Sequence, residues 1–200
     1  EDILKKYGAD ILRIWVASSN YAEDLRIDYN ILDQHSDSYR KIRNTFRYLL
    51  GNLNDTFESL DLEKINPKEL PELEQFMLHK IYSLNLEFNK CFKNYDFHNL
   101  YKELLNFCTI ELSAFYFDIR KDCLYCDTKD SDKRKSTLVL LNIILESLLK
   151  WFAPILSFTT EEIFQLISKN NKSIHLEKFL KFPKKFQNFE LNEKWSKLLE

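Results

Sequence analysis

The chain has 200 residues, a formal net charge of −2 and 44% hydrophobic residues, so it can bury a core of about one domain. It contains two glycines and four prolines, too few for the many turns of an all-β protein, which favours long helices. The near-neutral total excludes a chain that is basic throughout, so any contact with nucleic acid must come from a local patch. We find neither a signal peptide nor an apolar run long enough to cross a membrane, and expect a cytoplasmic location.

The first half of the chain begins with an amphipathic pattern over residues 2–18, typical of a helix. Turn-forming residues make 19–32 a connector. Asp33 is expected to cap a helix over 33–53, which a polar loop at 55–70 follows. Both ends of the chain lie inside helical patterns, so we expect a piece of a larger protein.

The second half is predicted from its start and stop signals. Pro71 suits a first helical turn, Asp96 is a capping residue, and a helix must end before Pro154. Thr159 with Glu162 has the spacing of a capping box. The predicted helices are 71–95, 97–122, 132–152 and 159–168, with a loop at 123–131 and a possible strand at Ile174–Leu176.

These elements predict an all-α fold, an antiparallel helical bundle with an N-terminal linker helix and a loose C-terminal extension. We assign 1–32 to a joint segment, 33–168 to the bundle and 169–200 to the extension, which would lead to a further C-terminal region.

The most informative stretch is 38–50, where a helix carries many cations and no acid. Arg40, Arg43, Asn44 and Arg47 share an arc of about 100° on a helix, away from the apolar stripe. Guanidinium groups match phosphates and stack on bases. We therefore regard this face, with Lys41, as a candidate RNA contact. The alternative is a solvated face whose arginines pair with acids of neighbouring helices.

A second basic cluster flanks the loop at 123–131. Arg120 and Lys121 precede it, and Lys133 and Arg134 follow it, so the four are expected near one end of the bundle. Cations at a helix C-terminus are also favoured by the helix dipole, which offers a purely structural explanation for the first two.

No catalytic or metal site is predicted. The two glycines rule out glycine-rich phosphate loops. Cys123 and Cys126 form a single pair with two intervening residues, whereas structural zinc takes four ligands. Cys91 and Cys108 fall on apolar helix stripes. We expect free thiols, no metal and no cofactor bound to these residues.

Four segments, in order, resemble the isoleucyl-tRNA synthetase family, a group of class I aminoacyl-tRNA synthetases. They are YGADILR at 7–13, YRKIRNTFRYLLGNL at 39–53, LSAFYFDIRKDCLYCD at 112–127 and APILSFTTEEIF at 153–164. The chain departs from the family's usual pattern at Phe76 and Phe164, where Trp is common, and at Ser157, where Pro is common. Cys123 and residues 28–30 also differ from it. These are packing or loop changes.

The resemblance implies the anticodon-binding helical region of an enzyme that attaches isoleucine to its tRNA with ATP and magnesium. Asn44 and the neighbouring arginines would face that tRNA. The catalytic and editing domains would lie outside this sequence, so the fragment alone would be inactive, with neither DNA nor a membrane as a partner. Two alternatives stay open: the same region of a valyl or leucyl enzyme, and a structural docking module that uses an exposed aromatic and basic tract at 179–189.

Overall fold

The computed structural model describes residues 2–53, 56–168 and 172–199, and every regular element in these ranges is helical. The α-helices are α1 (Asp2–Tyr7), α2 (Ala9–Ser18), α3 (Tyr29–Leu53), α4 (Glu72–Lys93), α5 (Phe97–Asn106), α6 (Phe117–Cys126), α7 (Asp132–Phe152), α8 (Ser157–Ile167) and α9 (Phe189–Leu199). Three short 3-10 turns are η2 (Pro67–Glu69), η4 (Ile174–Leu176) and η5 (Lys184–Phe186). A π-helical segment, η3 (Phe107–Tyr116), joins α5 to α6.

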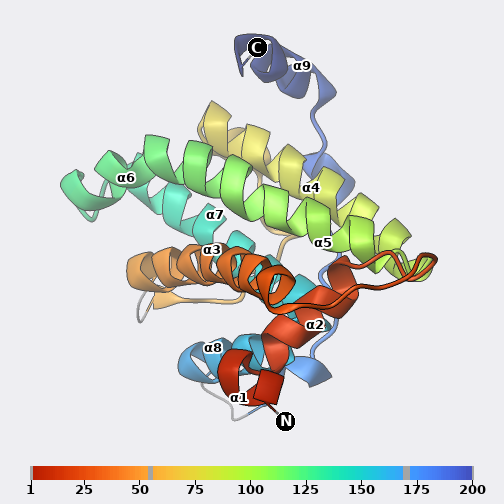
Figure 1. The fold of residues 1–200 in the computed structure, drawn as a ribbon. Helices are drawn as coiled ribbons and strands as arrows, with labels where there is room; N and C mark the ends of the chain where they lie inside the picture. Colours follow the sequence, from red (N-terminus) through yellow and green to blue (C-terminus); the bar gives the residue numbers. More distant parts are fainter. Residues whose placement is uncertain (1, 54–55, 169–171, 200) are drawn as a thin grey trace.

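The all-α bundle predicted from the sequence is confirmed. Helix α3 lies between the α5–α6 run and α8, while α9 lies beyond α4 at one end (Figure 1). Helix α7 packs against α3, α4, α6 and α8. Every residue from Leu140 to Phe152 is buried, as expected of a helix at the centre of a core, and the polar side chains in this stretch are Asn142, Glu146, Ser147 and Lys150.

The joint segment is two helices, so the single helix predicted over 2–18 is wrong. Gly8 separates α1 from α2 with a φ of 81°, a backbone conformation that a residue with a Cβ rarely adopts. Helix α2 then packs on α3, α5 and α8. The break therefore lets the chain change direction before it joins the bundle.

Helix α3 begins at Tyr29, four residues earlier than predicted. The side chain of Asp28 accepts a hydrogen bond from the backbone N–H of Ile31 at 2.8 Å, so Asp28 caps the helix and Asp33 lies inside it. The helix spans the predicted boundary between residues 32 and 33. The buried stripe of α3 consists of Leu32, Ile42, Thr45, Phe46, Leu49 and Leu53.

Helix α8 is not capped by the predicted box, because it begins at Ser157 and Thr159 lies within its first turn. The cap comes from α2: the carboxylate of Asp10 accepts hydrogen bonds from the backbone N–H groups of Phe158 and Thr159 at 3.3 and 2.8 Å. An acid at a helix N-terminus satisfies free N–H groups and complements the helix dipole.

Three further expectations change in the structure. The predicted loop at 123–131 is shorter, since α6 continues to Cys126. The possible strand at Ile174–Leu176 is the 3-10 turn η4, whose first N–H groups are bonded by Ser173 and Glu161 rather than by a neighbouring strand. The loop start at residue 55 and the extension start at residue 169 lie outside the described residues.

Candidate nucleic-acid interface

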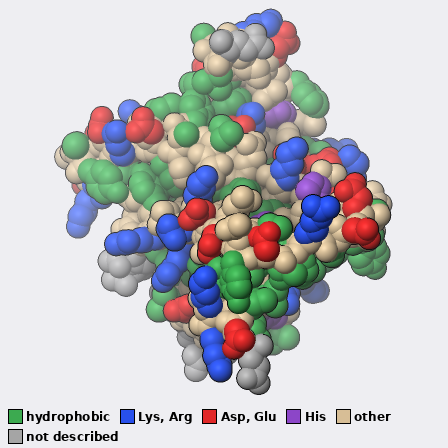
Figure 2. All heavy atoms as spheres, viewed as in Figure 1, with side chains coloured by type: hydrophobic (Ala, Val, Ile, Leu, Met, Phe, Trp, Pro, Cys, Tyr) green, Lys and Arg blue, Asp and Glu red, His purple; other side chains and the backbone are tan. Residues whose placement is uncertain are grey.

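The cationic face of α3 consists of Arg40, Lys41, Arg43, Asn44 and Arg47, and all five side chains are exposed. The buried stripe of α3 holds the opposite side of the helix against the core, which turns these residues outward. Basic side chains gather over α3 in the space-filling view (Figure 2). The structure therefore brings together the first group of residues that the sequence singled out.

The arginines of this face differ in their partners. Arg40 forms an ion pair with Asp37 at 3.2 Å, contrary to the expectation that the stretch lacks local acidic partners. Both side chains are well exposed, so the pair contributes little and exchanges readily. Within the described residues, neither Arg43 nor Arg47 makes an ion pair or a side-chain hydrogen bond. Their guanidinium groups are free to bind an anion.

A groove of about 450 Å³ runs between α3 and α8 beside these arginines. Its lining residues are Tyr39, Arg43, Phe46, Arg47, Leu50, Gly51, Thr159, Glu162, Ile163 and Leu166. The sequence did not indicate the α8 residues as part of a binding site, because the packing of two helices more than a hundred residues apart cannot be inferred from either helix alone.

The groove has an apolar floor and charged sides. Phe46 and Ile163 are buried beneath it, whereas Leu166 is 73% exposed at its edge. Arg43 and Arg47 lie on the α3 side and Glu162 on the α8 side, with no ion pair between them among the described residues. The groove thus combines an apolar floor with hydrogen-bond donors on one side and a carboxylate acceptor on the other.

The second basic cluster does not form one surface. Arg120 is only 6% exposed, and its guanidinium binds both carboxylate oxygens of buried Glu74 at 2.6 Å each. Tyr116 also donates to Glu74 at 3.0 Å, and the single proton of the Thr137 hydroxyl is shared between Glu74 at 3.3 Å and the Lys133 carbonyl at 2.8 Å. Arg120 is therefore committed inside the bundle, and we exclude it from the candidate interface. Sequence could not separate it from Lys121 because the partner acid lies on another helix.

The other members of that cluster stay near the surface. Lys121 is exposed and pairs with Asp118 at 2.8 Å. Lys133 is exposed as well. Arg134 is partly buried and donates to the backbone carbonyl of Asp127 at 2.8 Å, which closes the loop before α7. Lys121 and Lys133 are thus the two residues of this cluster that keep an accessible charge.

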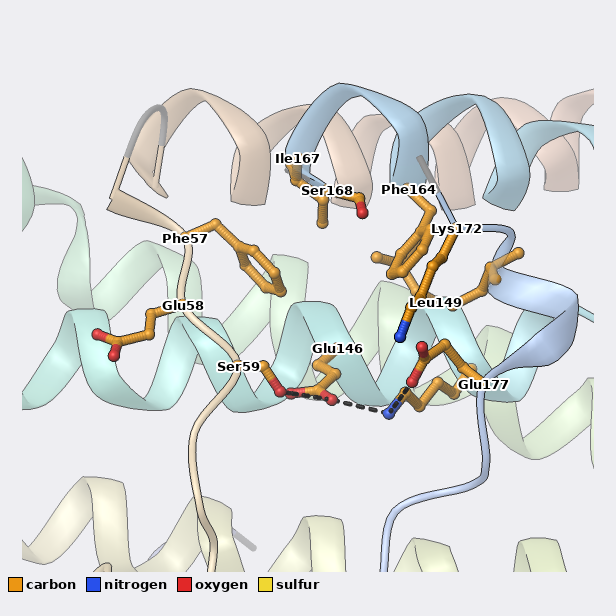
Figure 3. Close-up of a pocket in the computed structure, with 12 residues that line it drawn as sticks. Phe57, Glu58, Ser59, Glu146, Leu149, Phe164, Ile167, Ser168, Lys172 and Glu177 are labelled. Atoms are coloured by element: carbon orange, nitrogen blue, oxygen red, sulfur yellow. Dashed lines mark hydrogen bonds and ion pairs between the residues drawn. The ribbon is translucent and has the colours of Figure 1, made fainter. Parts of the chain in front are cut away.

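A separate pocket of about 400 Å³ lies between α7, the end of α8, the segment 57–59 and the segment 172–177, which includes η4 (Figure 3). Lys150 binds Glu146 at 2.8 Å and lies 3.7 Å from Glu177, while the Ser59 hydroxyl contacts both oxygens of Glu146 at 3.0 Å. These groups satisfy one another and fasten the segments near Ser59 and Glu177 to α7. We assign them a structural role.

The cysteines lie apart from any cluster of metal-ligating groups in the described ranges. Cys91, Cys108 and Cys123 are buried and Cys126 is exposed. Burial raises the pKa of the Cys108 thiol to about 12 and that of Cys91 to about 11. These thiols therefore remain protonated and serve as packing groups.

No described helix is both long and apolar enough to serve as a membrane span.

The tract at 179–189 differs from expectation, because most of its aromatic side chains point into the bundle. Phe186 is 1% exposed, and Phe179 and Phe182 pack against the core, which leaves Phe189 exposed. The tract is part of the bundle's packing, which removes the main support for a separate docking module.

Residues 74–200 match the family described as the anticodon-binding domain of tRNA ligase, and the chain belongs to this family. The cationic face of α3 precedes the matched region.

Similarity to individual proteins extends over the whole chain. It is 75% identical to the isoleucine–tRNA ligase of Pelagibacter ubique (strain HTCC1062) over 99% of its length, which is 22% of that protein. It is 43% identical to the isoleucine–tRNA ligase of Bartonella quintana (strain Toulouse), over 99% of the chain and 20% of the relative. The chain thus spans about a fifth of the relatives it matches.

Proposed function

We propose that the chain docks the anticodon stem and loop of a tRNA for isoleucine, as part of an isoleucine–tRNA ligase. The observation that supports the contact is the cationic face of α3, where Arg43 and Arg47 are exposed and have no partner in the part of the chain that the structure describes. The relatives described above are isoleucine–tRNA ligases, which favours isoleucine over the valyl and leucyl alternatives.

The chemistry of this face suits an RNA backbone. Guanidinium groups donate in a fork that matches phosphate oxygens, and the released counterions make such binding strongly dependent on salt. Asn44 lies between the arginines on the helix surface and carries both a donor and an acceptor, so it can bind a base edge that phosphate contacts do not read. The arginines would set affinity, and Asn44 would contribute discrimination.

The attachment of isoleucine to the tRNA would be carried out by other domains of the full-length protein. ATP, magnesium and isoleucine would bind in catalytic and editing domains that pack against this bundle, in the cytoplasm, with RNA rather than DNA as the nucleic acid. The 200-residue chain alone should then lack isoleucine-dependent exchange of pyrophosphate into ATP. Detection of that exchange with the purified chain would overturn this part of the proposal.

The binding experiment uses the full-length protein and a transcript of the isoleucine tRNA across a salt series. The variant Arg43→Ala with Arg47→Ala should weaken binding, and each lost phosphate contact should lower the slope of log affinity against log salt by about 0.7–0.9. The variant Asn44→Ala should keep the slope but reduce the preference for this tRNA over others.

The matched control removes two exposed lysines elsewhere, Lys64→Ala with Lys197→Ala. These side chains are 84% and 70% exposed and lie on a loop and on α9. The control has the same change in net charge as the double arginine variant, so it should leave affinity and slope nearly unchanged. Equal effects of the two pairs would mean that α3 has no special role and that binding follows net charge.

A further inference from the structure

We propose that the groove between α3 and α8 receives one unstacked RNA base, and that Glu162 selects a base carrying an amino group. This inference rests on the proposed function, since it names what part of the tRNA the α3 face holds. The shape and lining of the groove suit a base. A base is flat with apolar faces, and the groove floor is built from buried Phe46 and Ile163, within a volume in the range of ligand pockets.

The charges on the two sides of the groove are opposite in sign. Glu162 lies on one side of the groove and Arg43 and Arg47 lie on the other, and no ion pair joins them among the described residues. A base fits between such groups, because its edge carries acceptors for guanidinium donors and amino groups for a carboxylate. The unpaired arginines also favour an anionic partner, and a nucleotide supplies a phosphate next to its base.

Hydrogen bonds between α3, α8 and α2 fix the position of one groove wall. The Tyr39 hydroxyl lies 2.9 Å from the Thr159 hydroxyl, and Thr159 donates its proton to Asp10 at 2.6 Å. Tyr39 is therefore the donor to Thr159, and both side chains are locked at the groove wall. A preformed wall lowers the cost of ordering the site when a base binds.

Gly51 provides a way to fill the groove without disturbing the fold. It lines the groove within α3, and a Cβ placed there meets no atom within 4 Å. We expect Gly51→Trp to occupy the groove with its ring, while Gly51→Ala leaves it open. Both variants replace a glycine in a helix by a better helix former. Circular dichroism and a melting curve establish that each variant is folded.

The probe is a set of stem-loop RNAs with the anticodon-arm sequence, each with one loop base removed to leave an abasic sugar. With the full-length wild-type protein and with Gly51→Ala, one position should lose about 5- to 150-fold in affinity, as expected for one stacked base. With Gly51→Trp, that loss should disappear and the intact stem-loop should bind as weakly as the abasic one. The salt slope should stay unchanged, because the arginines remain.

A second set tests Glu162 by replacing that base with uracil, which lacks an amino group. The wild type should prefer the amino-bearing base, and Glu162→Gln should reduce the preference. An affinity that Gly51→Trp leaves unaltered, or an abasic loss that persists in it, would overturn the inference. A Gly51→Trp variant that melts earlier with RNA affinity intact would show that the protein itself fills the groove. After either outcome, RNA binding that still depends on salt and on Arg43 and Arg47 would leave the proposed function intact. If neither the wild type nor any variant binds the stem-loop, the proposed function and the base inference are both wrong.

Discussion

The carboxylate of Asp10 caps helix α8, which begins almost 150 residues later in the sequence, and accepts hydrogen bonds from both the backbone N–H and the hydroxyl of Thr159 at 2.8 and 2.6 Å. Arg13, one turn further along α2, donates to the backbone carbonyls of Pro154 and Ile155 just before α8. The joint segment is therefore fastened to the turn between α7 and α8. Because Thr159 also contacts Tyr39, this joint is linked to the wall of the candidate base groove.

We expect Asp10→Ala to lower the free energy of unfolding by about 1–3 kcal/mol, because it leaves the first N–H groups of α8 without a partner in a buried place. Urea denaturation measures the change. Asp24→Ala, an exposed acid in the connector, is the control and should change stability by less than about 0.5 kcal/mol. Similar values for the two variants would mean that the Asp10 cap contributes nothing to stability.

The ion pair of Glu74 with Arg120 should be strongly coupled. Arg120→Met leaves a buried carboxylate uncompensated, and we expect a loss of about 3–5 kcal/mol. Glu74→Gln combined with Arg120→Met removes that charge yet keeps an acceptor for Tyr116 and Thr137, so the double variant should recover part of the loss. Denaturation of the wild type, both single variants and the double variant gives the coupling. Additive effects would contradict it.

Two histidines should make stability depend on pH. Burial lowers the pKa of His79, helped by the charge of Lys80, and burial also lowers the pKa of His35. Protons then bind the unfolded chain more readily than the folded chain. Their contribution is fully present above the ordinary histidine pKa near 6.5 and is lost as the pH falls from there through the lowered values.

His79 also accepts the backbone N–H of Asn188 at its Nδ1 atom, at 3.0 Å, which a protonated ring cannot do. We expect His35→Gln with His79→Gln to flatten the fall in the free energy of unfolding between about pH 7.5 and 5.5. Urea titrations at a series of pH values test this. An equally steep fall in the double variant would assign the pH dependence to carboxylates instead.

Cys126 should be the thiol that reacts in the folded protein. The raised pKa values of Cys91 and Cys108 leave little thiolate at neutral pH, and burial raises the pKa of Cys123 as well. Alkylation at about pH 8 followed by mass spectrometry should label Cys126 first, and Cys126→Ser should abolish the fast phase. Early labelling of Cys108 would show that the core opens more readily than its packing indicates.

The local pattern of the chain was enough to predict most helices and their inner faces. The strongly apolar pattern of α7 and its end before Pro154 agree with the structure, as does the cap that Asp96 makes with the N–H of Asn99. The exposure of Arg43 and Arg47 likewise followed from their position opposite the buried stripe of α3. Such features depend on side chains within a few turns of one another, so periodicity and capping rules report them directly.

The tertiary structure alone decided which distant groups meet. Arg120 and Lys121 are neighbours with the same charge, yet Arg120 is buried because it binds Glu74 on α4, while Lys121 points to solvent. The cap of α8 by Asp10 and the groove between α3 and α8 arise in the same way. Arg120 and Asp10 are buried where a partner on another helix is fixed nearby, and that partner is placed by the packing of whole helices rather than by the residues beside them in the sequence.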